Sequence, residues 1–227
     1  MKKTVGMIFV FLFLSTALAG EESIVIWGDY PVVEELGKGS FEPAIRSEAA
    51  PLIPYGNGNE YRGKALQEAL HLLSANVYGY TFLYKPGSTL MKTEETFEVE
   101  IRGKIGPDNV TIIGEGVEDN IYRVKIQFGI TPSVRRWQTA FHTNTLRLLE
   151  SEGTSDFYSG WEGRSDALYE TLRNLVLIAA KLRLSSRPLL LKGDILLKGN
   201  PEFSVGAGRH YCRLSGYVNF VEILTYH

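Results

Sequence analysis

Histidine and cysteine, the residue types best suited to nucleophilic or metal chemistry, come close together once in this sequence. His210 and Cys212 are two residues apart in a segment expected to be a strand, so their side chains should share one face of it. A thiolate beside an imidazole could act as a nucleophile or supply half of a metal site. However, the chain has no second cysteine, and no carboxylate nearby in the sequence completes a site. The pattern favours a packed cysteine and a solvent-facing histidine, and we assign the pair no catalytic or metal role.

His142 is the other candidate for acid/base chemistry. Arg136 and Trp137 precede it on a predicted helix, and Asp156 follows further along. These groups could form an acid/base cluster only if the segment after the helix folds back. A histidine on the solvent side of a helix is the simpler interpretation.

Three aromatic residues, Phe157, Tyr158 and Trp161, surround Gly160. Aromatic side chains beside a glycine hinge in an exposed loop are typical anchors for a protein partner or a sugar ring. The alternative is that they fix the loop to the core. We take these three residues as the candidate partner-binding site.

Local catalytic motifs are missing from the sequence. It contains no His-Glu-x-x-His helix, no Gly-x-Ser-x-Gly elbow, no phosphate-binding loop and no dinucleotide glycine fingerprint. We therefore expect no cofactor, no metal site and no catalytic residue, although the sequence does not decide whether the protein is an enzyme.

The N-terminus has the three regions of a secretory signal peptide. Lys2 and Lys3 are followed by an apolar run from Val5 to Leu14 and by small residues before Gly20. A transmembrane anchor is the alternative, but a run of about 14 apolar or small residues is shorter than the roughly 20 that span a bilayer. We expect residues 1–19 to be removed and the mature protein to have no membrane span, in the periplasm or outside the cell.

Charge and cysteine content limit the partners of the mature chain. Without Lys2 and Lys3 it holds 22 basic and 26 acidic residues, a net charge of −4 with no run of like charge. This argues against a nucleic-acid surface. Cys212 is the only cysteine, so no intramolecular disulfide can form.

The stretch from Asn59 to Ile130 indicates one amphipathic helix followed by antiparallel strands. Asn59 suits the helix N-cap, and Gly79 suits its end. The apolar residues between them recur at helical spacing and predict one buried face: Leu66, Ala69, Leu70, Leu73 and Val77. Alternation of apolar and polar residues then predicts half-buried strands at 97–101 and 121–128, with a shorter strand at 110–113 and turns at 106–109 and 118–120.

The second half repeats the order of helices before strands. Thr131 and Pro132 predict a helix start, and apolar residues keep helical spacing to about residue 148. Residues 151–163, rich in Gly, Ser and aromatics, are expected to be a linker. Ser165 can cap a helix that ends before residue 188.

The apolar face of this later helix is predicted to contain Leu168, Thr171, Leu172, Leu175, Ala179 and Leu182. The strands expected after it are 189–191, 195–198, 203–205 and 211–224, with turns at 193–194 and 199–201 and a bend at Gly216.

Residues 59–130 contain the segments Arg62-Gly63-Lys64-Ala65-x-x-Glu68-Ala69-Leu70, Val77-Tyr78-Gly79, Gly103-Lys104-Ile105 and Tyr122-Arg123-Val124-Lys125-Ile126. Through these segments this part of the chain shows a resemblance to the Lpp-twenty lipoprotein family and the related N-terminal domain of flagellar assembly protein T. It implies a bacterial envelope or appendage protein without catalysis, in which a helix packs on a small antiparallel sheet. The chain departs from that group because no lipidation cysteine follows the signal segment and because residues from Ser133 onward do not match it.

The sequence thus predicts an α+β, two-layer protein with amphipathic helices packed on antiparallel sheet. We divide it into a signal peptide at 1–19, an extended N-terminal arm at 20–58, with strand 23–27 and a short helix at 41–50, a helix with strands at 59–130, and helices with strands at 131–227. The last part is either the same domain or a second one, formed by duplication or by extension of one sheet.

The functional expectation is an exported structural or assembly factor that binds another envelope or flagellar protein. The alternative is a secreted hydrolase that uses His142 or the pair His210 and Cys212. The sequence names neither the partner nor the oligomeric state.

Overall fold

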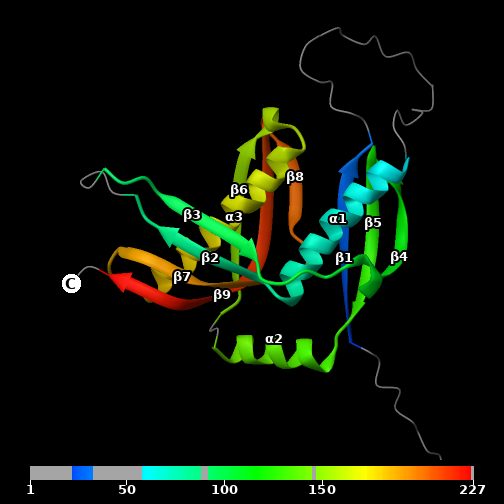
Figure 1. The fold of residues 1–227 in the computed structure, drawn as a ribbon. Helices are drawn as coiled ribbons and strands as arrows, with labels where there is room; N and C mark the ends of the chain where they lie inside the picture. Colours follow the sequence, from blue (N-terminus) through cyan, green and yellow to red (C-terminus); the bar gives the residue numbers. More distant parts are fainter. Residues whose placement is uncertain (1–21, 33–57, 88–91, 145–146, 226–227) are drawn as a thin grey trace, which may run out of the picture.

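The computed structural model describes residues 22–32, 58–87, 92–144 and 147–225. The fold is α+β, as predicted, with helices packed on antiparallel sheets (Figure 1). The helices are α1 (Gly58–Val77), α2 (Pro132–Asn144) and α3 (Glu162–Arg183), with short 3-10 turns η1 (Pro107–Asn109) and η2 (Phe157–Ser159). The strands are β1 (Ser23–Pro31), β2 (Tyr80–Lys85), β3 (Thr96–Ile101), β4 (Thr111–Glu118), β5 (Ile121–Gly129), β6 (Leu149–Asp156), β7 (Pro188–Leu197), β8 (Glu202–Gly206) and β9 (Arg209–Thr225). The predicted signal peptide and the predicted helix at 41–50 lie outside the described residues.

Helix α1 packs on a three-stranded sheet with the order β1-β5-β4. Ile26, Val124 and Ile126 are fully buried between this sheet and the helix. The helix lies very close to β1, because a Cβ atom added to Gly28 would come within 2.1 Å of the carbonyl oxygen of Ala65. A residue with a side chain at position 28 would force α1 away from the sheet.

Helix α3 packs on a second sheet of six strands. Five of them have the order β3-β2-β7-β9-β6, and the sixth, β8, pairs with β9. The long strand β9 changes partner along its length. Residues 209–216 pair with β6, and residues 216–225 pair with β7. Gly216, where we expected a bend, is therefore the residue shared by both ladders.

The division at residue 130 does not separate the two sheets. β2 and β3 precede this residue but belong to the sheet of β7 and β9, whereas β1, β4 and β5 form the other sheet. β1, longer than the predicted strand at 23–27, pairs with β5 through nine residues, so residues 23–31 are part of a sheet rather than an arm. In the part of the chain that the structure describes, the long helices α1 and α3 each cover one sheet, as in a two-layer arrangement, and Val134 of α2 joins the core beneath α1.

Several local predictions are confirmed. α1 ends just before Gly79, and Thr131 Oγ1 accepts a hydrogen bond of 3.3 Å from Val134 N–H at the start of α2. The turn at 199–201 is present, and the Asn76 amide holds it through hydrogen bonds with both backbone groups of Gly199, at 2.7 and 3.0 Å.

Other local predictions are wrong. The expected linker at 151–163 is mostly strand β6 and the first turn of α3, since the inward positions of β6 are the small residues Ser151 and Gly153, which give no apolar alternation. Ser165 lies inside α3, which begins at Glu162. Gly193 is no turn, because β7 continues through it with a shift of register.

The predicted apolar faces are partly misplaced. Leu66 and Leu70 are only half-buried on α1, whereas Ala65 and Leu72 occupy the core. On α3, Leu182 is 61% exposed. Each helix contacts its sheet through a face that is rotated slightly from the predicted apolar stripe. The sheet therefore leaves part of that stripe uncovered.

Candidate functional site

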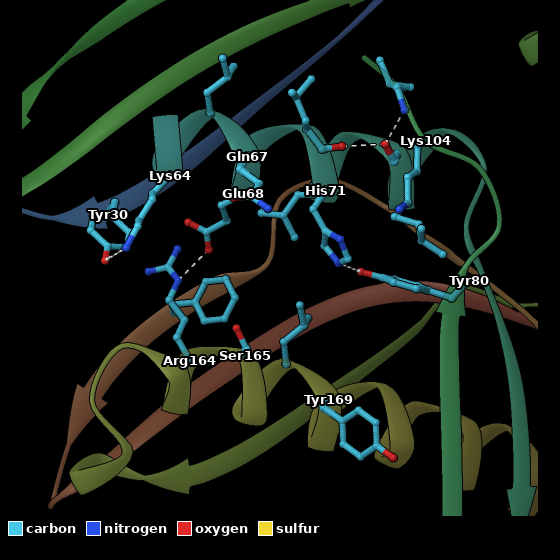
Figure 2. A pocket seen from close by; sticks show the side chains of 18 of the residues that line it. Tyr30, Lys64, Gln67, Glu68, His71, Tyr80, Lys104, Arg164, Ser165 and Tyr169 are labelled. Atoms are coloured by element: carbon cyan, nitrogen blue, oxygen red, sulfur yellow. Dashed lines mark hydrogen bonds and ion pairs between the residues drawn. The ribbon is translucent and has the colours of Figure 1, made fainter. Parts of the chain in front are cut away.

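A cleft with a volume of about 870 Å³ lies between α1 and α3. Residues of β2, β3 and the loop after β3 complete its walls. Figure 2 shows Lys64, Glu68 and His71 along one side of α1, with Arg164 of α3 reaching toward Glu68. A cavity of this size is in the range that holds small ligands, roughly 300 to 1,000 Å³.

The apolar part of the cleft is the part of the helix stripes that the sheets do not cover. Leu66 and Leu70 come from α1, Leu168 from α3, and Val99 and Ile101 from β3. All five are half-buried. The cleft therefore offers an apolar wall that remains accessible to solvent.

At one end of the cleft, ion pairs join α3 to α1 and β1. Arg164 Nε lies 2.9 Å from Glu68 Oε1, and its terminal nitrogen lies 3.5 Å from Asp29 Oδ2. Asp29 also accepts two hydrogen bonds from Arg123, at 2.7 and 3.1 Å. The Asp29 backbone N–H donates to Glu68 Oε2 at 2.7 Å. The Arg164 and Asp29 side chains are only 10% and 8% exposed. We therefore interpret this network as a structural contact that holds α3 against α1 and β1.

Two aromatic rings enclose the Arg164 guanidinium. Its central carbon lies 4.8 Å from the ring centre of Trp161 and 3.8 Å from that of Phe203. Burial raises the pKa of the Glu68 carboxyl, and the charge of Arg164 offsets this effect only in part. Removing Arg164 would therefore leave Glu68 in an environment that disfavours its charge.

The other end of the cleft holds His71, Tyr80 and Lys104. His71 Nε2 lies 2.9 Å from the Tyr80 hydroxyl. Removal from solvent lowers the pKa of His71, and the nearby charge of Lys104 lowers it further. Burial raises the pKa of the Tyr80 hydroxyl, which therefore stays protonated. This end combines a neutral imidazole, a phenol and a lysine cation, groups that suit hydrogen bonding to an anion.

The three predicted partner-binding aromatics have different surroundings. Tyr158 is 92% exposed and Phe157 is 46% exposed, both on η2 between β6 and α3. Phe157 stacks on His210, with ring centres 5.5 Å apart. Trp161 instead lines the cleft, where its ring meets Tyr30 edge to face at 5.7 Å. The structure thus brings Phe157 and Tyr158 together on the surface and places Trp161 at the adjoining end of the cleft.

His210 and Cys212 point toward α3, so they share a face as predicted. Both are buried, at 8% and 1% exposure, and the expectation of a solvent-facing histidine is wrong. Burial raises the pKa of the Cys212 thiol to about 11, which leaves it protonated near neutral pH and unsuited to nucleophilic attack. His210 Nε2 is buried without a hydrogen-bond partner in the described part of the chain.

The cluster of His142 with Asp156 does not form. The centres of the His142 and Tyr217 rings lie 4.5 Å apart. Asp156 lies opposite Arg209 in the pairing of β6 with β9. Tyr217 and Arg209 are eight residues apart on β9, about 26 Å along a strand. The segment that would have had to fold back for such a cluster is strand β6, which carries Asp156 away from His142.

Glu68, His71 and Arg164 were not among the site residues that the sequence predicted. Lys64, Glu68 and His71 recur at i, i+4 and i+7 and form a polar stripe along α1. That spacing was the available signal for a polar cleft wall. Arg164 carried no such signal, because only the packing of α3 against α1 brings it to Glu68. Among the described residues, no group of three or more His, Cys, Asp or Glu side chains is arranged to hold a metal ion.

The fold and the cleft define an α+β protein with helices on two antiparallel sheets and a ligand-sized cleft between two helices. The chain belongs to an uncharacterised protein family, whose model matches residues 30–226. Searches of curated proteins and of solved structures found no match. Within the described residues, no helix is long and apolar enough to cross a membrane.

Proposed function

We propose that this protein is an exported bacterial envelope protein, periplasmic or secreted, that acts as a structural or assembly factor. In this proposal it binds another envelope or flagellar protein through the aromatic surface formed by Phe157, Tyr158 and Trp161. The signal-peptide pattern at 1–19 supports export. The resemblance of residues 59–130 to the Lpp-twenty group supports an envelope role and remains an inference from the sequence.

The observation that carries the proposal is the exposure of Tyr158 on a rigid turn. The residue is 92% exposed, yet its backbone is held in place. Asp156 Oδ1 accepts a hydrogen bond of 3.0 Å from Tyr158 N–H, and Gly160 N–H donates to Phe157 O at 3.0 Å. A large aromatic side chain on a fixed backbone loses little entropy on binding. Interface anchors have these properties.

Site-specific photo-crosslinking in cells tests the proposal. A photoreactive phenylalanine at position 158 should capture one envelope protein, identified by mass spectrometry. The same probe at Leu182 provides the matched control, because Leu182 is 61% exposed at the far end of α3. Equal capture at both positions, or capture of no envelope protein at position 158, would contradict the proposal.

A quantitative test uses the identified partner and the double variant Tyr158→Ala/Trp161→Ala. Loss of two aromatic anchors should weaken binding by about 2 kcal/mol or more, roughly thirtyfold in the dissociation constant. Leu182→Ala should leave the affinity unchanged. A loss in the double variant no larger than in Leu182→Ala would mean that the aromatic surface is not the interface.

A further inference from the structure

Most polar side chains that line the cleft bond to one another. Glu68 pairs with Arg164 at 2.9 Å, and the Lys64 ammonium donates to the Tyr30 hydroxyl at 3.0 Å. His71 is likewise tied to Tyr80. A ligand that needs many hydrogen bonds, such as a sugar, would have to break these contacts. The cleft thus favours a ligand with few polar groups.

Near Lys104, the hydroxyl of Ser74 is also engaged in hydrogen bonds within the protein. Ser74 Oγ donates to Leu70 O at 2.7 Å and accepts from the backbone N–H of Ile105 at 2.9 Å. Both contacts fix the loop after β3 against α1. This loop carries Lys104 into the cleft wall.

Lys104 differs from these paired groups. Its side chain is exposed and makes no ion pair with any other residue that the structure describes. It lies close enough to His71 for its charge to act on that imidazole. This end of the cleft therefore holds a cation without a counter-charge, beside a histidine that can donate or accept a hydrogen bond.

An apolar wall continues from this cationic end. Leu70, Ile101 and Leu168 lie along it, each half-buried and open to the cleft. Removing such apolar surface from water is favourable, in proportion to the area covered. An aliphatic chain would gain this energy without needing hydrogen bonds.

We propose that the α1/α3 cleft binds a fatty acid, with its carboxylate at Lys104 and His71 and its chain along Leu70, Ile101 and Leu168. A single anionic head matches Lys104, which has no ion pair among the described residues, and a plain aliphatic chain matches the apolar wall. A peptide would bring backbone amides for which the cleft side chains leave few free partners. This ligand does not depend on the aromatic surface binding a protein, so either proposal can fail alone.

Titration calorimetry on the purified mature protein tests the assignment, with each amphiphile below its micelle concentration. Dodecanoate should bind with one-to-one stoichiometry, whereas dodecylamine should bind at least tenfold more weakly, because its ammonium meets Lys104. Octanoate should also bind at least tenfold more weakly than dodecanoate, since it lacks four methylene groups. Lys104→Ala should weaken dodecanoate binding by about tenfold or more, and Lys104→Arg should retain most of it.

Lys125→Ala is the matched control. It removes the same charge from an exposed position on β5 outside the cleft, and it should leave dodecanoate binding unchanged. Equal affinity for dodecanoate and dodecylamine, or equal losses in Lys104→Ala and Lys125→Ala, would overturn the proposal. A short peptide of apolar residues with one acidic side chain provides a further test. If it displaces dodecanoate and binds more tightly than dodecanoate does, the ligand is a protein segment and the proposal is overturned.

Discussion

Replacing Arg164 by leucine should destabilise the protein much more than the loss of an ordinary surface ion pair. Arg164 is the cation between Glu68 and Asp29, and its side chain is only 10% exposed. In Arg164→Leu, Asp29 keeps Arg123, but Glu68 loses the one ion-pair partner that it has among the described residues. Breaking a buried pair by removing one member costs about 3 to 5 kcal/mol. Since the Glu68 side chain is 22% exposed, we expect the lower end, about 3 kcal/mol.

The pH dependence gives this prediction a specific signature. Burial raises the pKa of folded Glu68, and the loss of Arg164 would raise it further. A carboxyl whose pKa is raised in the folded state costs stability at pH values where it is charged, and this cost disappears as it becomes protonated. The difference in unfolding free energy between wild type and Arg164→Leu should therefore decrease as the pH falls from about 7 toward the ordinary glutamate pKa of about 4.3.

Urea denaturation of four proteins at both ends of this pH range measures the effect. Glu68→Gln in the Arg164→Leu background removes the unpaired charge and should restore part of the lost stability at about pH 7. Arg213→Leu is the control, because its pair with Glu152 is 61% exposed on both sides and should contribute less than about 1 kcal/mol. A loss in Arg164→Leu similar to that in Arg213→Leu, or no recovery on adding Glu68→Gln, would refute the reasoning.

Three further predictions follow from burial and from the N-terminal pattern. Leu73→Ala, at a fully buried position, should cost about 2 to 5 kcal/mol in chemical denaturation; Leu70→Ala should cost clearly less because Leu70 is half-buried at the cleft, and equal losses would contradict this placement. Cys212 should react slowly with a thiol reagent in the folded protein and rapidly in denaturant, because burial raises its pKa to about 11; labelling at equal rates would contradict the buried thiol. N-terminal sequencing of the exported protein should find Gly20 first, and an intact Met1 in the envelope fraction would disprove export by cleavage.

Much of the buried face of α3 was predictable from the spacing of apolar residues in the sequence. Leu172, Leu175 and Ala179 have helical spacing in the sequence and are buried on α3. The alternation in β5 was equally informative, since Val124 and Ile126 are fully buried there. Both signals are local, because each arises from the repeat of one element against one apolar surface.

Strand β6, in contrast, could not be predicted from its local sequence pattern. Its inward residues Ser151 and Gly153 are small because α3 lies directly on them: Ser151 Oγ donates to Thr171 O, and a Cβ at Gly153 would come within 2.5 Å of Thr171 N. The strand therefore has no apolar alternation, and its composition looks like that of a linker. Its position depends on a helix packed against it and on pairing with β9.

The sequence by itself determined the class of fold and many of the periodic helices and strands, because these depend on neighbouring residues, and its N-terminal pattern predicts export. Only the tertiary structure decided which strands share a sheet and which side chains meet in the cleft. Glu68 and Arg164 are separated by 96 residues, and nothing in either local segment specifies the other. Their contact exists because α1 and α3, each held on its own sheet, bring the uncovered parts of their surfaces to face one another.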